Sequence, residues 1–124
     1  MKTFKIKEDI FKTETLFVIG EQEEVGDYLK KSFGIDADLD KLTSGSLFQK
    51  VGSKSADDFF RIIYLEKFDK NNIDSLVHEL FHLTARICQD KGVPIVSNIS
   101  TGENGDETAA YLLEFYVKKC LDKL

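Results

Sequence analysis

Two histidines and a glutamate form the one stretch of this sequence whose residue types and spacing suggest catalysis. His78, Glu79 and His82 lie in His-Glu-Leu-Phe-His, which has the pattern H-E-x-x-H and contains both histidines of the chain. Residues four apart lie one turn above each other on a helix, so both imidazoles could bind one metal ion. Glu79 lies at the edge of that face, where its carboxylate could accept a proton from water. The pattern predicts one zinc ion per chain and hydrolytic chemistry.

The alternative is that these are two surface histidines on an ordinary amphipathic helix. At about 100° per residue, the histidines fall opposite the arc expected to pack on a core. That arc contains Ile73, Leu76, Val77, Leu80, Leu83, Thr84, Ile87 and Cys88. Two histidines placed at random would fall four apart on the order of one percent of the time, which favours a metal site.

The helix that carries the motif is predicted over residues 72–91. Asp69 to Asn72 form a turn that can supply an N-cap. At the other end, Gly92 can take the C-cap position, and Pro94 prevents the helix from continuing. Residues 93–105 are predicted to form a long loop.

A third ligand is expected from a second helix, predicted over residues 106–121 with Asp106 as its N-cap. Glu107 lies in its first turn, and antiparallel pairing of the two helices would bring it toward the histidines. Two imidazoles, one carboxylate and an open position for water are typical of catalytic zinc. Glu103 and Glu114 are competing candidates, and a surface glutamate at a helix N-terminus is the alternative for Glu107.

Residues 1–68 are predicted to supply the sheet and one helix. Thr15 to Ile19 is β-branched and aromatic and predicts a strand, with a weaker strand within Phe4 to Phe11. Glu21 to Phe33 has helical spacing and ends at Gly34, a plausible C-cap. A short strand is expected within Ser46 to Val51, and a longer strand within Asp58 to Phe68.

Composition limits the class of protein. The 124 residues are expected to form a single domain, and the net charge of -5 argues against a nucleic-acid partner. No signal peptide or membrane-spanning run is evident, so a cytoplasmic protein is expected. Cys88 and Cys120 are expected to be buried reduced thiols, although a bridge between their helices stays open. The sequence does not determine the oligomeric state.

The second half of the chain resembles known peptidases. The runs are Leu76 to His82, Gly92-Val93 and Asp106 to Leu112, and Phe17 to Gly20 fits the same pattern. A helical H-E-x-x-H followed by a helical glutamate resembles the gluzincin zinc metallopeptidases. The small size resembles the minigluzincins, and the quoted runs themselves resemble peptidases encoded by phages and prophages.

The resemblance implies a minimal zincin-like α+β fold, in which a small mixed sheet packs against the motif helix and a C-terminal glutamate helix. His78, His82 and Glu107 would be zinc ligands, and Glu79 the general base and acid. The strand from Phe59 to Glu66, centred on Ile63, Tyr64 and Leu65, would be the edge that binds an extended peptide. Larger gluzincins have asparagine where this chain has Asp106, and a further histidine or tyrosine to stabilise the oxyanion. Tyr111, Tyr64 and Arg86 are the candidates for that role.

Two functions follow from these observations. The first is a zinc-dependent metallopeptidase that hydrolyses a peptide or protein substrate through Glu79. The second is a catalytically silent relative, either a zinc-binding or a metal-free interaction domain of phage or prophage origin. Membrane partners are not expected.

Overall fold

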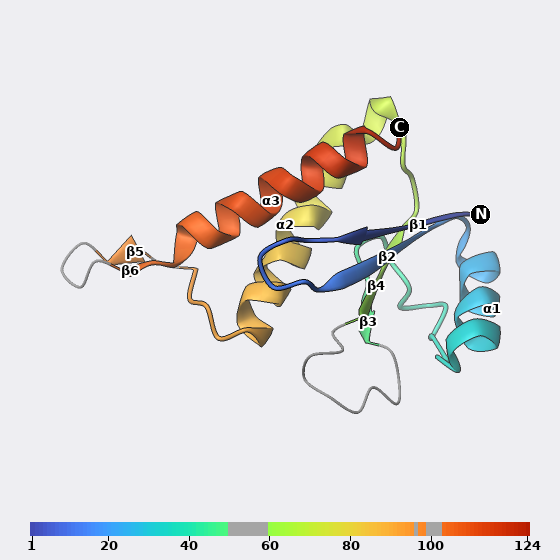
Figure 1. Cartoon of the computed structure of the whole chain (residues 1–124). Coiled ribbons are helices and arrows are strands. Elements are labelled where there is room, and N and C mark those ends of the chain that lie inside the picture. The colour runs from blue at the N-terminus through green and yellow to red at the C-terminus, as the bar shows by residue number, and fades with distance from the viewer. Residues whose placement is uncertain (50–59, 96, 99–102) are drawn as a thin grey trace.

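A mixed four-stranded sheet forms the centre of the structure, with helices on both faces (Figure 1). The computed structural model describes residues 1–49, 60–95, 97–98 and 103–124. The strands are β1 (Lys2–Lys7), β2 (Glu14–Ile19), β3 (Leu47–Gln49) and β4 (Phe60–Leu65), in the order β1-β2-β4-β3. Strands β2 and β4 are parallel, whereas the other two pairs are antiparallel. The predicted α+β class with a small mixed sheet is confirmed.

The helices lie close to their predicted positions. They are α1 (Gln22–Phe33), α2 (Ile73–Asp90) and α3 (Gly105–Leu121), and a short 3-10 turn, η1 (Lys70–Asn72), precedes α2. Gly34 ends α1 in the left-handed conformation, with φ of 68°, as its predicted capping role requires. Between α2 and α3, β5 (Ser97–Asn98) pairs with β6 (Glu103–Asn104), where the sequence predicted a loop.

Alternation along β4 divides the interior into two clusters. Ile63 and Leu65 face α2 and α3, whereas Ile62 and Tyr64 face α1. Because successive side chains of a strand point to opposite faces, a continuous apolar run can serve two layers at once. This explains the nearly unbroken apolar character of the strand.

The apolar arc predicted for α2 is the arc that packs. Its buried residues are Leu76, Leu80, Leu83, Thr84, Ile87 and Cys88. From α3, Ala109, Leu112, Tyr116 and Cys120 join the same cluster. Cys88 and Cys120 are buried free thiols, as predicted, and burial raises the pKa of both.

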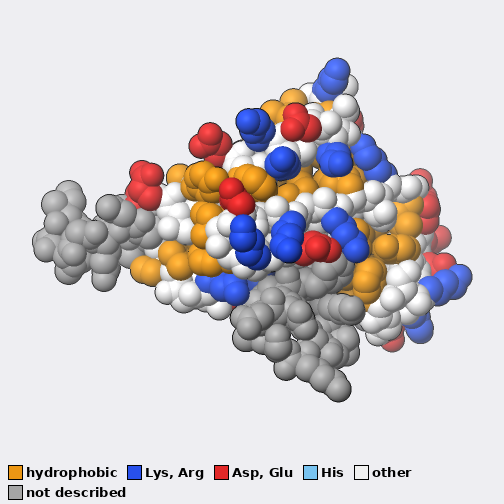
Figure 2. All heavy atoms as spheres, viewed as in Figure 1, with side chains coloured by type: hydrophobic (Ala, Val, Ile, Leu, Met, Phe, Trp, Pro, Cys, Tyr) orange, Lys and Arg blue, Asp and Glu red, His pale blue; other side chains and the backbone are white. Residues whose placement is uncertain are grey.

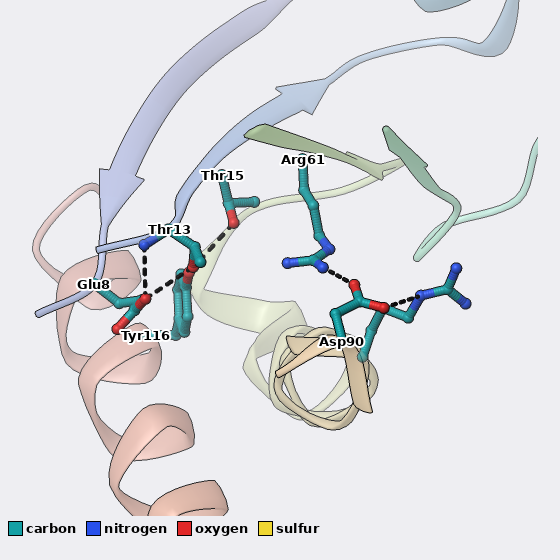
Figure 3. Close-up of polar contacts among 7 residues, drawn as sticks. Glu8, Thr13, Thr15, Arg61, Asp90 and Tyr116 are labelled. Atoms are coloured by element: carbon teal, nitrogen blue, oxygen red, sulfur yellow. Dashed lines mark hydrogen bonds and ion pairs between the residues drawn. The ribbon is translucent and has the colours of Figure 1, made fainter. Parts of the chain in front are cut away.

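A buried carboxylate shapes the turn between β1 and β2. Glu8 is fully buried and accepts hydrogen bonds from the backbone N–H groups of Ile10 and Phe11. It also accepts from the backbone N–H and the hydroxyl of Thr13 (Figure 3). A carboxylate with several donors is satisfied despite its burial. The turn starts at this residue, so β1 ends at Lys7, and the strand predicted within Phe4 to Phe11 lies in the first half of that range.

Charges are well mixed on the surface. Figure 2 shows acidic, basic and hydrophobic side chains interspersed on one face of the molecule. Of the helices that the structure describes, none combines the length and the apolar character needed to cross a membrane.

Candidate metal centre

His78 and His82 lie together on the exposed side of α2. Their Nε2 atoms are 3.2 Å apart, and the ring centroids are separated by 4.8 Å. Two nitrogens bound to one tetrahedral zinc, each at about 2.0–2.1 Å, are roughly 3.3 Å apart. The separation also suits a hydrogen bond between neutral rings. The two imidazoles therefore fit a shared metal ion without rearrangement of the helix.

Glu79 leaves the helix beside this pair but is much less exposed. Its side chain is 16% exposed, against 67% for His78, and Oε1 lies 4.0 Å from His78 Nε2. Its carboxylate contacts the backbone at Gly45, where a Cβ atom would overlap Oε2. The carboxylate is thus sheltered on one side and close to the imidazoles on the other.

The predicted third ligand is not beside the histidines. Glu107 is exposed in the first turn of α3. Among the residues that the structure describes, no three histidine, cysteine, aspartate or glutamate side chains are grouped closely enough to hold a metal ion. Glu114 is exposed farther along α3, and the Glu103 side chain lies outside the described part. The structure brings His78, Glu79 and His82 together and leaves Glu107 apart.

The three candidate oxyanion donors have other partners. The Tyr111 hydroxyl donates to Asp9 Oδ2 at 3.0 Å, and this hydrogen bond is the main cause that raises its pKa. The Arg86 Nε atom lies 3.7 Å from Asp90 Oδ1, one turn farther along α2. The prediction for Tyr64 is wrong, because its side chain lies on the α1 face of the sheet and donates to the Gly20 carbonyl.

The predicted substrate-binding edge is also misplaced. Strand β4, which contains Ile63, Tyr64 and Leu65, pairs with β2 on one side and β3 on the other. Just before β3 in the chain, the Gly45 N–H donates to the Tyr64 carbonyl, and the Ser46 carbonyl accepts from the Tyr64 N–H. These residues of β4 have no free backbone edge for a peptide. Among the described strands, β3 is the edge on this side.

A buried ion pair that the sequence interpretation missed lies between the sheet and α2. Arg61 of β4 is 2% exposed and pairs with Asp90, the last residue of α2 (Figure 3). Burial lowers the pKa of Arg61. The signal in the sequence was a lone arginine within an apolar strand, which needs a buried acidic partner. The pair fixes the end of α2 on the sheet, two turns beyond His82.

An open groove of about 520 Å³ runs along α3, away from the histidines. It is lined by Ala110, Leu113, Glu114, Val117, Lys118, Leu121 and Asp122. The lining is mostly apolar and contains no imidazole. The groove is therefore separate from the candidate metal centre.

Comparison with known proteins adds no relative. No protein family, curated protein or solved structure matches the chain.

Proposed function

We propose that the protein is a zinc-dependent metallopeptidase of the gluzincin type. His78 and His82 hold the metal, Glu107 is the third ligand, and Glu79 is the general base and acid. The observation that carries the proposal is the 3.2 Å separation of the two Nε2 atoms, with the Glu79 carboxylate 4.0 Å from one of them. That separation is what a shared tetrahedral ion requires.

The chemistry assigned to the residues follows from their positions. When bound, zinc supplies a Lewis acid that makes water nucleophilic near neutral pH. Glu79 accepts the proton of that water and delivers it to the nitrogen of the leaving amine. Its carboxylate is sheltered by the backbone at Gly45, so little solvent competes for the proton.

Glu107 is assigned by chemistry rather than by contact. It is exposed, and no described group of three potential ligands includes the histidine pair. Coordination by Glu107 therefore requires the first turn of α3 to approach α2. The two helices already pack through their apolar faces.

The substrate class is an extended peptide. Gly45, which contacts Glu79, leads directly into β3, the outermost described strand on this side of the sheet. A peptide that added to this edge would run past the carboxylate and the histidines. We assign β3 this role in place of β4.

The test compares wild-type protein with Glu79→Gln. Both are loaded with zinc, incubated with a mixture of unstructured peptides, and analysed by mass spectrometry over a dilution series. We expect wild-type protein to produce new termini and Glu79→Gln to lose at least about 100-fold in rate while keeping its zinc. Glu114→Gln, an exposed glutamate on α3, is the matched control.

Identical peptide profiles for wild-type protein and Glu79→Gln at every dilution would contradict peptidase activity. That outcome would favour the alternative, a catalytically silent domain. The dilution series distinguishes it from an enzyme whose cleft is blocked by self-association.

A further inference from the structure

Gly45 joins the sheet to the candidate metal centre. It lies just before β3, and its N–H donates to the Tyr64 carbonyl at 2.7 Å. The Tyr64 N–H donates in turn to the Ser46 carbonyl at 2.9 Å. These bonds hold the backbone of Gly45 against the central strand β4, so its position is set by the sheet.

The carboxylate of Glu79 occupies the space beside this backbone. A Cβ atom on Gly45 would overlap Glu79 Oε2, and it would lie 3.2 Å from Oε1. The clash involves the functional end of Glu79 rather than an inert part of the side chain. A residue with any side chain at position 45 must therefore displace that carboxylate.

Gly45 is also in a conformation that favours glycine, with φ of 95°. This second requirement can be separated from the first within the same chain. Gly34 and Gly92 have φ of 68° and 70°, and a Cβ on either would meet nothing within 4 Å. Substitution at those positions adds backbone strain without any contact with Glu79.

We propose that Gly45 is a positioning residue for Glu79. By lacking a side chain, it lets the backbone support one side of the carboxylate, which places Oε1 4.0 Å from His78 Nε2. The placement of the Glu79 carboxylate by Gly45 rests on their contact alone. The effect of that placement on catalysis rests on the proposed peptidase function. A displaced carboxylate would no longer lie where it can accept the proton of the attacking water.

The first test is a double-mutant cycle on stability with Gly45→Ala, Glu79→Ala and the double variant. Removing the carboxylate should relieve the overlap but not the backbone strain. The carboxylate is the far end of a flexible side chain, so its displacement costs little stability. We expect Gly45→Ala to raise the unfolding equilibrium constant about threefold more in wild-type protein than in the Glu79→Ala background. Gly34→Ala in the same two backgrounds is the control and should show additive effects. Additive effects for Gly45→Ala as well would overturn the proposal.

If Gly45→Ala does not fold, the double variant tests whether positions 45 and 79 are coupled. A cooperative unfolding transition in the double variant, which carries both Gly45→Ala and Glu79→Ala, would show this coupling. A double variant that stays unfolded while Glu79→Ala alone folds would contradict it.

The second test measures zinc content and peptide hydrolysis of Gly45→Ala. We expect zinc content to equal that of wild-type protein, kcat to fall at least about tenfold, and KM to change less than kcat. If wild-type protein hydrolyses peptides and Gly45→Ala has the same kcat, the positioning role is overturned. If wild-type protein hydrolyses nothing but the stability coupling is present, the peptidase proposal fails and the contact between Gly45 and Glu79 stands.

Discussion

The Nε2 atoms of His78 and His82 lie 3.2 Å apart on the exposed side of α2, one helical turn from each other. Neither ring is needed for packing, since the buried residues of this helix lie on its other side. This separation is close to that of two nitrogen ligands on one tetrahedral zinc ion. The predictions below test that arrangement and the fold that holds it.

Removing one histidine should remove the metal. For His82→Ala we expect zinc measured by mass spectrometry to fall from one per chain to near none, because only one imidazole and the proposed Glu107 carboxylate would remain to hold the ion. Gln89→Ala changes an exposed residue farther along the same helix and is the control. Full zinc content in purified His82→Ala would exclude this residue as a ligand.

Glu107 should contribute to affinity if it is the third ligand. We expect Glu107→Gln to weaken zinc binding at least about tenfold in a competition titration with a chelator, since a carboxylate ligand is lost. Glu114→Gln, on the same helix, should leave the affinity unchanged. Equal affinities for the two variants would exclude Glu107 from the site and require another third ligand.

The buried ion pair should be costly to break. Asp90→Asn leaves the charge of Arg61, which is 2% exposed, without its carboxylate. We expect the free energy of unfolding to fall by about 3 kcal/mol in urea denaturation. Arg86→Ala should cost under about 1 kcal/mol, because Arg86 is 52% exposed. A loss for Asp90→Asn no larger than that for Arg86→Ala would show that the buried pair does not support the fold.

Alkaline pH should destabilise the protein through Tyr116. Burial is the main cause that raises the pKa of Tyr116 to about 12, above the unfolded value of about 10. The stability contribution of the neutral hydroxyl is complete below pH 10 and is lost as pH rises toward 12, in total about 3 kcal/mol. We expect Tyr116→Phe to remove this part of the alkaline decline in stability.

The same variant should lose about 1 kcal/mol at neutral pH, because the hydroxyl is 3.2 Å from Thr15 Oγ1. Cys120, whose pKa burial also raises to about 12, contributes a separate decline that starts near pH 9 and that Cys120→Ala should remove. An unchanged pH dependence between 10 and 12 in Tyr116→Phe would contradict the assignment to Tyr116.

The sequence predicted the helices well because their signals are local. Gly34 is the C-cap of α1 as predicted, whereas the C-cap of α2 is Lys91, and Gly92 follows it in the left-handed conformation. The apolar spacing from Leu76 to Cys88 identified the packing face of α2. Placing the histidines opposite that face followed from helical geometry alone. Such inferences need no knowledge of which other segments lie nearby.

The errors concern contacts between distant segments. An apolar run such as β4 does not reveal which strands flank it, so its position inside the sheet could not be derived. The hydroxyl of Tyr64 faces α1 because of strand alternation in a register that the sequence does not specify. The contact between Gly45 and Glu79 joins residues 34 positions apart and leaves no local pattern.

The most direct test of the central claim is a crystal structure of the zinc-loaded protein, with anomalous data collected on both sides of the zinc absorption edge. We predict one anomalous peak per chain at about 2.0–2.1 Å from the Nε2 atoms of both His78 and His82. A peak that is strong above the zinc absorption edge and weak below it would identify the metal as zinc. A zinc-loaded crystal with no peak at the two histidines, or with its peak elsewhere, would contradict the account.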